Sequence, residues 1–210
     1  MRRAEALVAA LVLAVLAVGL ALVPLELPWF TRVLAERYSE LPSGISLPLA
    51  EASRRFVIVS DTAAQDVLAR FMTADAISHL EDVQGVILAA NIATSLMALL
   101  AVTWMVLRRS DTRLIARALA GAAVGIGAFL LLAVGVALID FDSFFSAFHG
   151  IFFAEGTWTF PSDSVLIRLF PESFWTIAGV TWAALIGVIA LGYGIASWVL
   201  GKRVSDVHGR

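Results

Sequence analysis

Apolar residues are gathered in four long runs along the chain, at residues 6–25, 83–107, 114–139 and 174–200. Each run reaches the roughly 20 residues that a helix needs to cross about 30 Å of hydrocarbon. A bilayer core offers no water to backbone polar groups, so such runs span it as helices. The pattern predicts an all-α membrane protein with a four-transmembrane-helix bundle, organised as a single integral membrane domain.

The first run has an alternative interpretation as a cleaved signal peptide. Arg2 and Arg3 precede it, and the small residues Gly19 and Ala21 resemble a cleavage site. The apolar region of a signal peptide has roughly 7–15 residues, however, and this run is longer. We therefore interpret it as an uncleaved signal anchor.

Basic residues indicate the orientation of the spans. They gather at one set of span ends, as Arg2, Arg3, Arg108, Arg109, Arg113, Arg117, Lys202, Arg203 and Arg210. The positive-inside bias places both termini in the cytoplasm (N-in/C-in) and the loops 26–82 and 140–173 outside. We expect a multi-pass protein of the cell (plasma) membrane. The formal net charge is −2, and nothing in it indicates a nucleic-acid partner.

The first outer loop carries helical signals. Apolar residues recur at helical spacing over 29–41, which predicts an amphipathic helix on the outer interface, and residues 42–44 read as a turn. Residues 56–59 fit a short strand or a buried stretch equally well. A capping box at 62–65 predicts a helix that runs to about Phe71.

A second capping box, at residues 78–81, predicts that Ser78 is the N-cap of the helix that becomes the second span. The second outer loop is dense in phenylalanine, so it must enter the interface or pack on the first loop. Phe144, Phe148 and Phe152 share helical spacing there, and Gly156 is placed to end that helix. The two loops should thus cap the bundle with short amphipathic helices.

Two of the three histidines, His79 and His149, fall near the outer ends of spans and so at a similar membrane depth. Histidine exchanges protons near neutral pH, so the pair suggests general acid/base chemistry at the lipid–water boundary. Asp82 lies three residues after His79 and could orient its ring. The plainer alternative is that interfacial histidines hydrogen-bond headgroups or backbone. His208 is in the C-terminal tail and receives no role.

Metal and thiol chemistry have little support in the sequence. The chain has no cysteine, which excludes disulfides, thiolate metal sites and a cysteine nucleophile. His79, His149, Asp82 and an acid such as Asp140 or Glu155 lack the tight spacing of a metal site. We predict no metal and no cofactor.

Two motifs carry a resemblance to a known family. Residues 78–83 read Ser-His-Leu-Glu-Asp-Val and lead directly into the second span. Residues 148–153 read Phe-His-Gly-Ile-Phe-Phe, and Trp158, Phe160-Pro161 and Leu169-Phe170-Pro171 follow them. Together with the four-span layout and the loop sizes, these motifs resemble the Lit family, the lipoprotein intramolecular transacylases. Gln84 departs from the basic residue expected there.

The resemblance implies an enzyme, an intramolecular O-to-N acyltransferase. It would move the sn-2 acyl chain of the diacylglyceryl cysteine of bacterial lipoproteins to the cysteine α-amino group, giving the lyso form. The family's essential histidines map onto His79 and His149, and we assign His79 as base and His149 as acid, although the sequence does not fix which is which. The active site would face the extracytoplasmic side.

The resemblance also implies a substrate site. The aromatic loop, with Phe148, Phe152, Trp158 and Phe160, would form an apolar cleft for acyl chains. Arg168 would face a headgroup, a carbonyl or an oxyanion, or act as a plain interface anchor. The partners would be diacylated lipoproteins and membrane lipids. The alternatives are a non-enzymatic membrane scaffold that binds a partner, and a related acyltransferase with another lipid substrate.

Overall fold

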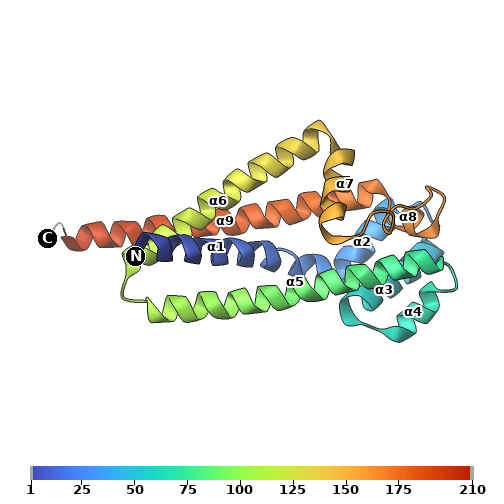
Figure 1. Cartoon of the computed structure of the whole chain (residues 1–210), viewed down its shortest axis with the longest axis horizontal. Helices are drawn as coiled ribbons and strands as arrows, with labels where there is room; N and C mark the ends of the chain where they lie inside the picture. The colour runs from blue at the N-terminus through green and yellow to red at the C-terminus, as the bar shows by residue number, and fades with distance from the viewer. Residues whose placement is uncertain (1, 209–210) are drawn as a thin grey trace. The chain divides into compact units, whose positions relative to one another are not determined.

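The computed structural model describes the backbone of residues 2–208 and the side chains of residues 2–202. This part of the chain is all-helical, at 84% helix with no strand, which confirms the predicted class. In chain order (Figure 1) the helices are α1 (Arg2–Leu20), the 3-10 helix η1 (Val23–Glu26), α2 (Pro28–Tyr38), α3 (Ser43–Val59), α4 (Thr62–Leu68), α5 (Ala74–Leu107), α6 (Thr112–Ile139), α7 (Phe141–Phe152), α8 (Val165–Leu169) and α9 (Glu172–His208).

Four helical segments are long and apolar enough to cross a membrane, as the sequence predicts. They are Arg2–Glu26, Ala74–Leu107, Thr112–Ile139 and Glu172–Lys202. The chain packs into two compact units, and the residues of α5 and α9 are divided between them. Each unit has its own buried apolar core.

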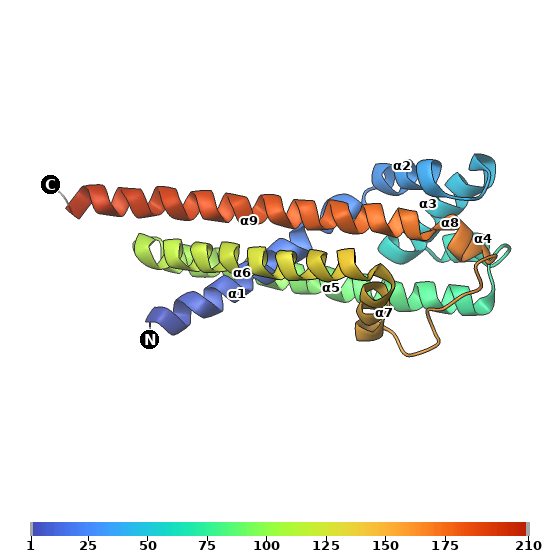
Figure 2. The same cartoon turned by 90° about the horizontal axis from the view of Figure 1, so that it is seen from above.

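The first unit contains α1, α5 from Asn91, α6 as far as Leu138 and α9 from Ala183. Its core is made largely of small side chains that let helices approach closely, as expected between membrane helices. A Cβ on Gly19 in α1 would overlap the side chain of Thr94 in α5, and one on Gly121 in α6 would lie 3.1 Å from the Cβ of Ala10. Glycine at these positions therefore permits the close packing of α1. The backbone of α1 runs at an angle to that of α6 (Figure 2).

The second unit covers Leu22–Ala90 and Ile139–Trp182 and holds both predicted histidines. Its core is formed by the facing sides of α2, α3 and α4 together with the start of α5, α8 and the start of α9. Side-chain hydrogen bonds join these helices: Gln84 Nε2 donates to the carbonyl oxygen of Phe56 at 2.8 Å, and Gln65 Nε2 donates to Glu81 Oε1 at 2.7 Å. Gln84, which departs from the family pattern, thus links α5 to the end of α3.

The structure assigns the undecided stretch 56–59 to the last turn of α3, where Phe56 is buried in the core. The predicted turn at 42–44 is wrong in part, because Pro42 is the N-cap of α3 and Ser43 and Gly44 already belong to its first turn. Helix α3 ends at Val59, and its C-cap is Ser60, whose φ of 58° is left-handed. This C-cap lets the chain reverse directly into α4.

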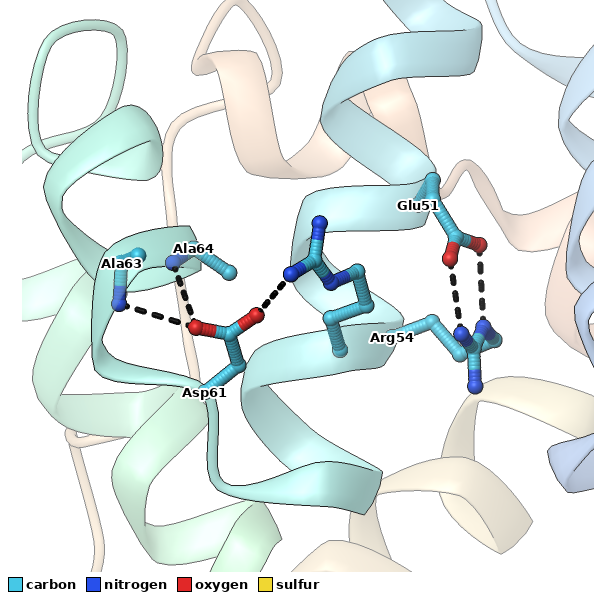
Figure 3. Close-up of polar contacts among 6 residues, drawn as sticks. Glu51, Arg54, Asp61, Ala63 and Ala64 are labelled. Carbon is cyan, nitrogen blue, oxygen red and sulfur yellow. Dashed lines mark hydrogen bonds and ion pairs between the residues drawn. The ribbon is translucent and has the colours of Figure 1, made fainter.

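Asp61, rather than Thr62, caps α4 (Figure 3), so the predicted capping box at 62–65 is wrong and the N-cap lies one residue earlier. One carboxylate oxygen of Asp61 accepts from the N–H groups of Ala63 and Ala64, at 3.0 and 3.3 Å, and the other pairs with Arg55. An acceptor that also carries charge suits a helix N-terminus better than a hydroxyl does. The helix ends at Leu68, three residues before the predicted end.

The second predicted capping box is wrong, because α5 begins at Ala74 and Ser78 lies inside it. Thr73 Oγ1 accepts from the backbone N–H of Ala76 at 3.3 Å. Ala76 and Ile77 are buried in the core, so packing extends the helix upstream of the sequence signal. His79 therefore lies in the second turn of α5.

The predicted helix around His149 is present as α7, but Gly156 does not end it. Its C-cap is Phe153, and Gly156 lies in the following segment with a φ of +84°, a conformation that favours glycine. At the start of α7, the Asp140 side chain accepts from the Ser143 N–H at 3.0 Å and from its hydroxyl at 2.6 Å. These hydrogen bonds lower the pKa of the Asp140 carboxyl and make it the N-cap of α7.

Candidate active site

Both histidines belong to the second unit, and aromatic rings bring them together. His79 projects from α5 and His149 from α7, and both side chains are half-buried. The ring of Phe153 lies 4.9 Å from that of His79 and 5.7 Å from that of His149, measured between centroids. The two imidazoles are therefore separated by at most the sum of these two distances.

The rings around the histidines form one group, which we call the aromatic cluster. Phe160 lies 5.6 Å from His79, while Phe145, Trp158 and Phe148 lie 3.9, 4.8 and 5.6 Å from His149. The members are His79, Phe145, Phe148, His149, Phe152, Phe153, Trp158 and Phe160. The predicted residues Phe148, Phe152, Trp158 and Phe160 thus all belong to it.

Phe145 and Phe153 are cluster members that the predicted site residues did not include. Each lies four residues from His149, one on either side. Residues four apart meet on one helix face, so this spacing was available as a signal. Phe153 is the more informative omission, because it is the ring that touches both histidines.

A backbone contact fixes the proton position on His149. Its Nδ1 lies 2.8 Å from the carbonyl oxygen of Phe145. A carbonyl oxygen only accepts, so we assign the proton to Nδ1, which donates this hydrogen bond. In the neutral ring Nε2 is then left with a free lone pair, as a general base requires.

The surroundings of His149 also favour its neutral form. Burial lowers the pKa of the His149 imidazole, and the hydrogen bond to Phe145 opposes that shift more weakly. The positive form loses more from leaving water than the neutral form does. His149 thus stays a neutral base to lower pH than an exposed histidine would.

His79 has a different polar environment. Its Nδ1 is buried and has no hydrogen-bond partner among the described side chains and backbone. The predicted orienting residue, Asp82, is exposed on the same helix and acts on His79 through its charge, not through a bond to this nitrogen. Orientation of the His79 ring comes instead from its ring contacts with Phe153 and Phe160.

Arg168 has partners away from the aromatic cluster. Its guanidinium donates to the carbonyl oxygen of Glu40 at 3.4 Å, and its own carbonyl accepts from the Glu40 N–H at 2.9 Å and the Ser39 hydroxyl at 3.2 Å. These bonds tie α8 to the connection between α2 and α3. Arg168 therefore stabilises the packing of α8 against this connection.

No group of three or more histidine, aspartate and glutamate side chains that could hold a metal occurs in the described part of the chain. The groups available for chemistry are two imidazoles set among aromatic side chains. One ring has a fixed tautomer with a free Nε2, and the other presents an unpartnered nitrogen. Such a pair can move protons to and from a substrate held between aromatic side chains.

By class, then, this is an all-helical membrane protein with four membrane-length helices and an aromatic cluster that contains two histidines, one from α5 and one from α7. A family model described as lipoprotein intramolecular transacylase Lit matches residues 48–175, which include every member of the aromatic cluster. The chain belongs to the Lit family and is an enzyme of the transacylase type.

Solved structures share the fold. The membrane integral lipoprotein intramolecular transacylase Lit from Bacillus cereus aligns with a TM-score of 0.77 at 15% identity, covering 98% of each chain. A variant of that protein with a histidine replaced by arginine aligns at 0.72 with 15% identity, over 99% of this chain and 95% of that one. A second variant, with alanine there, aligns at 0.71 with 14% identity over 98% and 96%. No similar sequence was found among curated proteins.

Proposed function

We propose that this chain moves the sn-2 acyl chain of a diacylglyceryl cysteine, at the N-terminus of a bacterial lipoprotein, onto the α-amino group of the same cysteine. The observation that carries the proposal is the meeting of His79 and His149 around Phe153. Membership of the Lit family supplies the reaction class and the lipoprotein substrate. The product is the lyso form of the lipoprotein.

The proton balance of this reaction matches two imidazoles. An α-ammonium becomes an amide N–H and so loses two protons; one ends on the glycerol oxygen and the other goes to solvent. The free Nε2 of His149 suits it to take the first proton, since an α-ammonium has a pKa of about 7.7–8.0. This tautomer favours His149 as the first base, the reverse of the assignment made from sequence.

After the first proton has left, the amine attacks the ester carbonyl and a nitrogen–carbon bond forms. His79 takes the second proton from nitrogen and passes it to the glycerol oxygen as the carbon–oxygen bond breaks. The N-acyl chain and the free glycerol hydroxyl result, and no acyl-enzyme forms. Amine and ester belong to one molecule, so the enzyme's main task is to hold them in an attack geometry.

Exposed apolar side chains on α7 support an acyl-chain surface. Phe148, Ile151 and Phe152 are 38%, 74% and 46% exposed, and they follow one another along this short helix. The predicted cleft residues Trp158 and Phe160 lie deeper in the same cluster. We propose that the acyl chains lie on these rings, while Asp82 tunes His79 through its charge.

The basic residues support an N-in/C-in orientation in the cell membrane. In the first unit, Arg2 pairs with Asp111 at 3.3 Å and Arg108 with Glu5 at 2.6 Å, so the N-terminus and the α5–α6 connection lie at one end of that unit. We propose that this end is cytoplasmic and that the segments with the aromatic cluster face the extracytoplasmic side.

Mass spectrometry of a lipopeptide tests the proposal. The purified chain in lipid nanodiscs is incubated with a synthetic diacylglyceryl-cysteinyl peptide, and fragmentation locates the acyl chain. We expect N-acylated lyso product from the natural chain and from the control His208→Ala. We expect His79→Ala and His149→Ala each to lose about 10²–10⁴-fold in rate. An acyl chain that stays on glycerol with the natural chain would refute the transacylase and favour a scaffold.

A further inference from the structure

The indole of Trp158 carries an unused hydrogen-bond donor. Its Nε1 is buried, and it has no partner within the part of the chain that the structure describes. An indole nitrogen can only donate, and burying it without an acceptor is unfavourable. A native structure that leaves such a donor unpaired calls for an explanation, and a role toward a ligand is one of the few available.

The position of this donor relates it to the proposed base. The Trp158 ring stacks on His149 with centroids 4.8 Å apart and planes inclined by 30°, and its other neighbour Phe145 lies 6.3 Å away. Amine and ester carbonyl come to about 3–3.5 Å from each other in an attack geometry. An amine at Nε2 of His149 therefore brings the carbonyl into the neighbourhood of the indole.

The other candidate donor is engaged elsewhere. From the sequence, Arg168 is a candidate to bind an oxyanion. In the structure its guanidinium donates instead to the carbonyl oxygen of Glu40, in the connection between α2 and α3. His149 Nδ1 already donates its hydrogen bond to the carbonyl oxygen of Phe145. Among the cluster side chains, Trp158 thus holds a donor that is not committed to another group of the described protein.

We infer that the Nε1–H of Trp158 donates a hydrogen bond to the carbonyl oxygen of the sn-2 ester and to the oxyanion formed from it. This inference rests on the proposed function. When the nitrogen–carbon bond forms, the π pair of the carbonyl moves onto oxygen, and the indole stabilises that charge while keeping its own proton. Trp158 sits between α7 and α8, outside regular structure, so substrate entry can uncover the donor.

Replacement of the indole N–H by sulfur is the sharpest test. β-(3-Benzothienyl)alanine keeps the ring shape and removes the donor, so it is placed at position 158 of the full chain in nanodiscs. The same replacement at Trp175, which packs on Phe170 and Phe174 outside the aromatic cluster, is the matched control. Kinetics with the diacylglyceryl-cysteinyl peptide yield kcat and KM for each protein.

The expected result is a fall in kcat of about 10²-fold at position 158 with KM nearly unchanged, because removal of an oxyanion donor acts on the transition state. The variant at position 175 should keep the natural kcat. A natural kcat at position 158, or a loss seen only in KM, would overturn the inference. Failure of the proposed function is a different result, in which the natural chain itself makes no lyso product. Trp158→Phe, with its thermal stability measured alongside, should show the same loss.

Discussion

The hydrogen bond from Nδ1 of His149 to Phe145 links a backbone geometry to a chemical role. The carbonyl lies four residues earlier in the same helix, so α7 itself sets the tautomer of its histidine. Burial also lowers the pKa of that ring, so its neutral form persists to lower pH than in an exposed histidine. A single short helix thus sets both the position and the tautomer of the proposed base.

This arrangement predicts the pH dependence of the reaction. Burial lowers the pKa of His149, and the neutral form is the base in the proposed mechanism, so kcat should rise with pH through that pKa and reach a plateau. We expect the midpoint of the rise below about 6.5, the ordinary value for histidine. Single-turnover rates between pH 4.5 and 8 measure it. A midpoint near 7 or above would contradict a desolvated base.

Sequence reasoning could find the histidines but not their partners. Both imidazoles stood out because they are polar groups beside spans, and the family motifs contain them. The bridging role of Phe153 depends on tertiary packing, as does the free donor of Trp158. Asp82 was selected by helical spacing, yet spacing cannot tell whether a side chain turns toward its neighbour or toward solvent.

At the scale of elements, a glycine in α1 allows this helix to approach α5 closely. A side chain at Gly19 would collide with Thr94, whereas Gly125 in α6 has open space around its Cβ position. We expect Gly19→Ala to lower the free energy of unfolding by about 1–3 kcal/mol, the usual cost of overpacking. Thermal unfolding in detergent measures it.

The control for this prediction is Gly125→Ala, which makes the same chemical change in a helix without the collision. It should be neutral or slightly stabilising, since alanine is the better helix former by about 1 kcal/mol. Equal stability changes for the two variants would show that the close approach of α1 to α5 is not a packing constraint.

Element boundaries were the least predictable feature. Two capping boxes were read from sequence, and both were misplaced, because Asp61 and Thr73 cap the helices instead. A box motif reports a local preference, whereas burial of Ala76 and Ile77 in the core decides where α5 starts. The four apolar helices were predictable because membrane length alone specifies them.

For the molecule as a whole, the proposed orientation can be read by chemical labelling. The chain has no cysteine, so single cysteines can be introduced without further engineering. Ser162 lies between α7 and α8, and Ser110 lies between α5 and α6; both are exposed. In intact cells a membrane-impermeant maleimide should label Ser162→Cys, and should label Ser110→Cys only after permeabilisation. The opposite labelling pattern would contradict the proposed orientation.

The central claim is that His79 and His149 act together on one substrate molecule. A double-mutant cycle on single-turnover rates tests it most directly, with His79→Ala, His149→Ala and the double variant in nanodiscs. Residues that act as a unit are strongly non-additive, so the double variant should be about as slow as the slower single variant. Losses that multiply in the double variant would mean that the two imidazoles work independently, and would contradict the account.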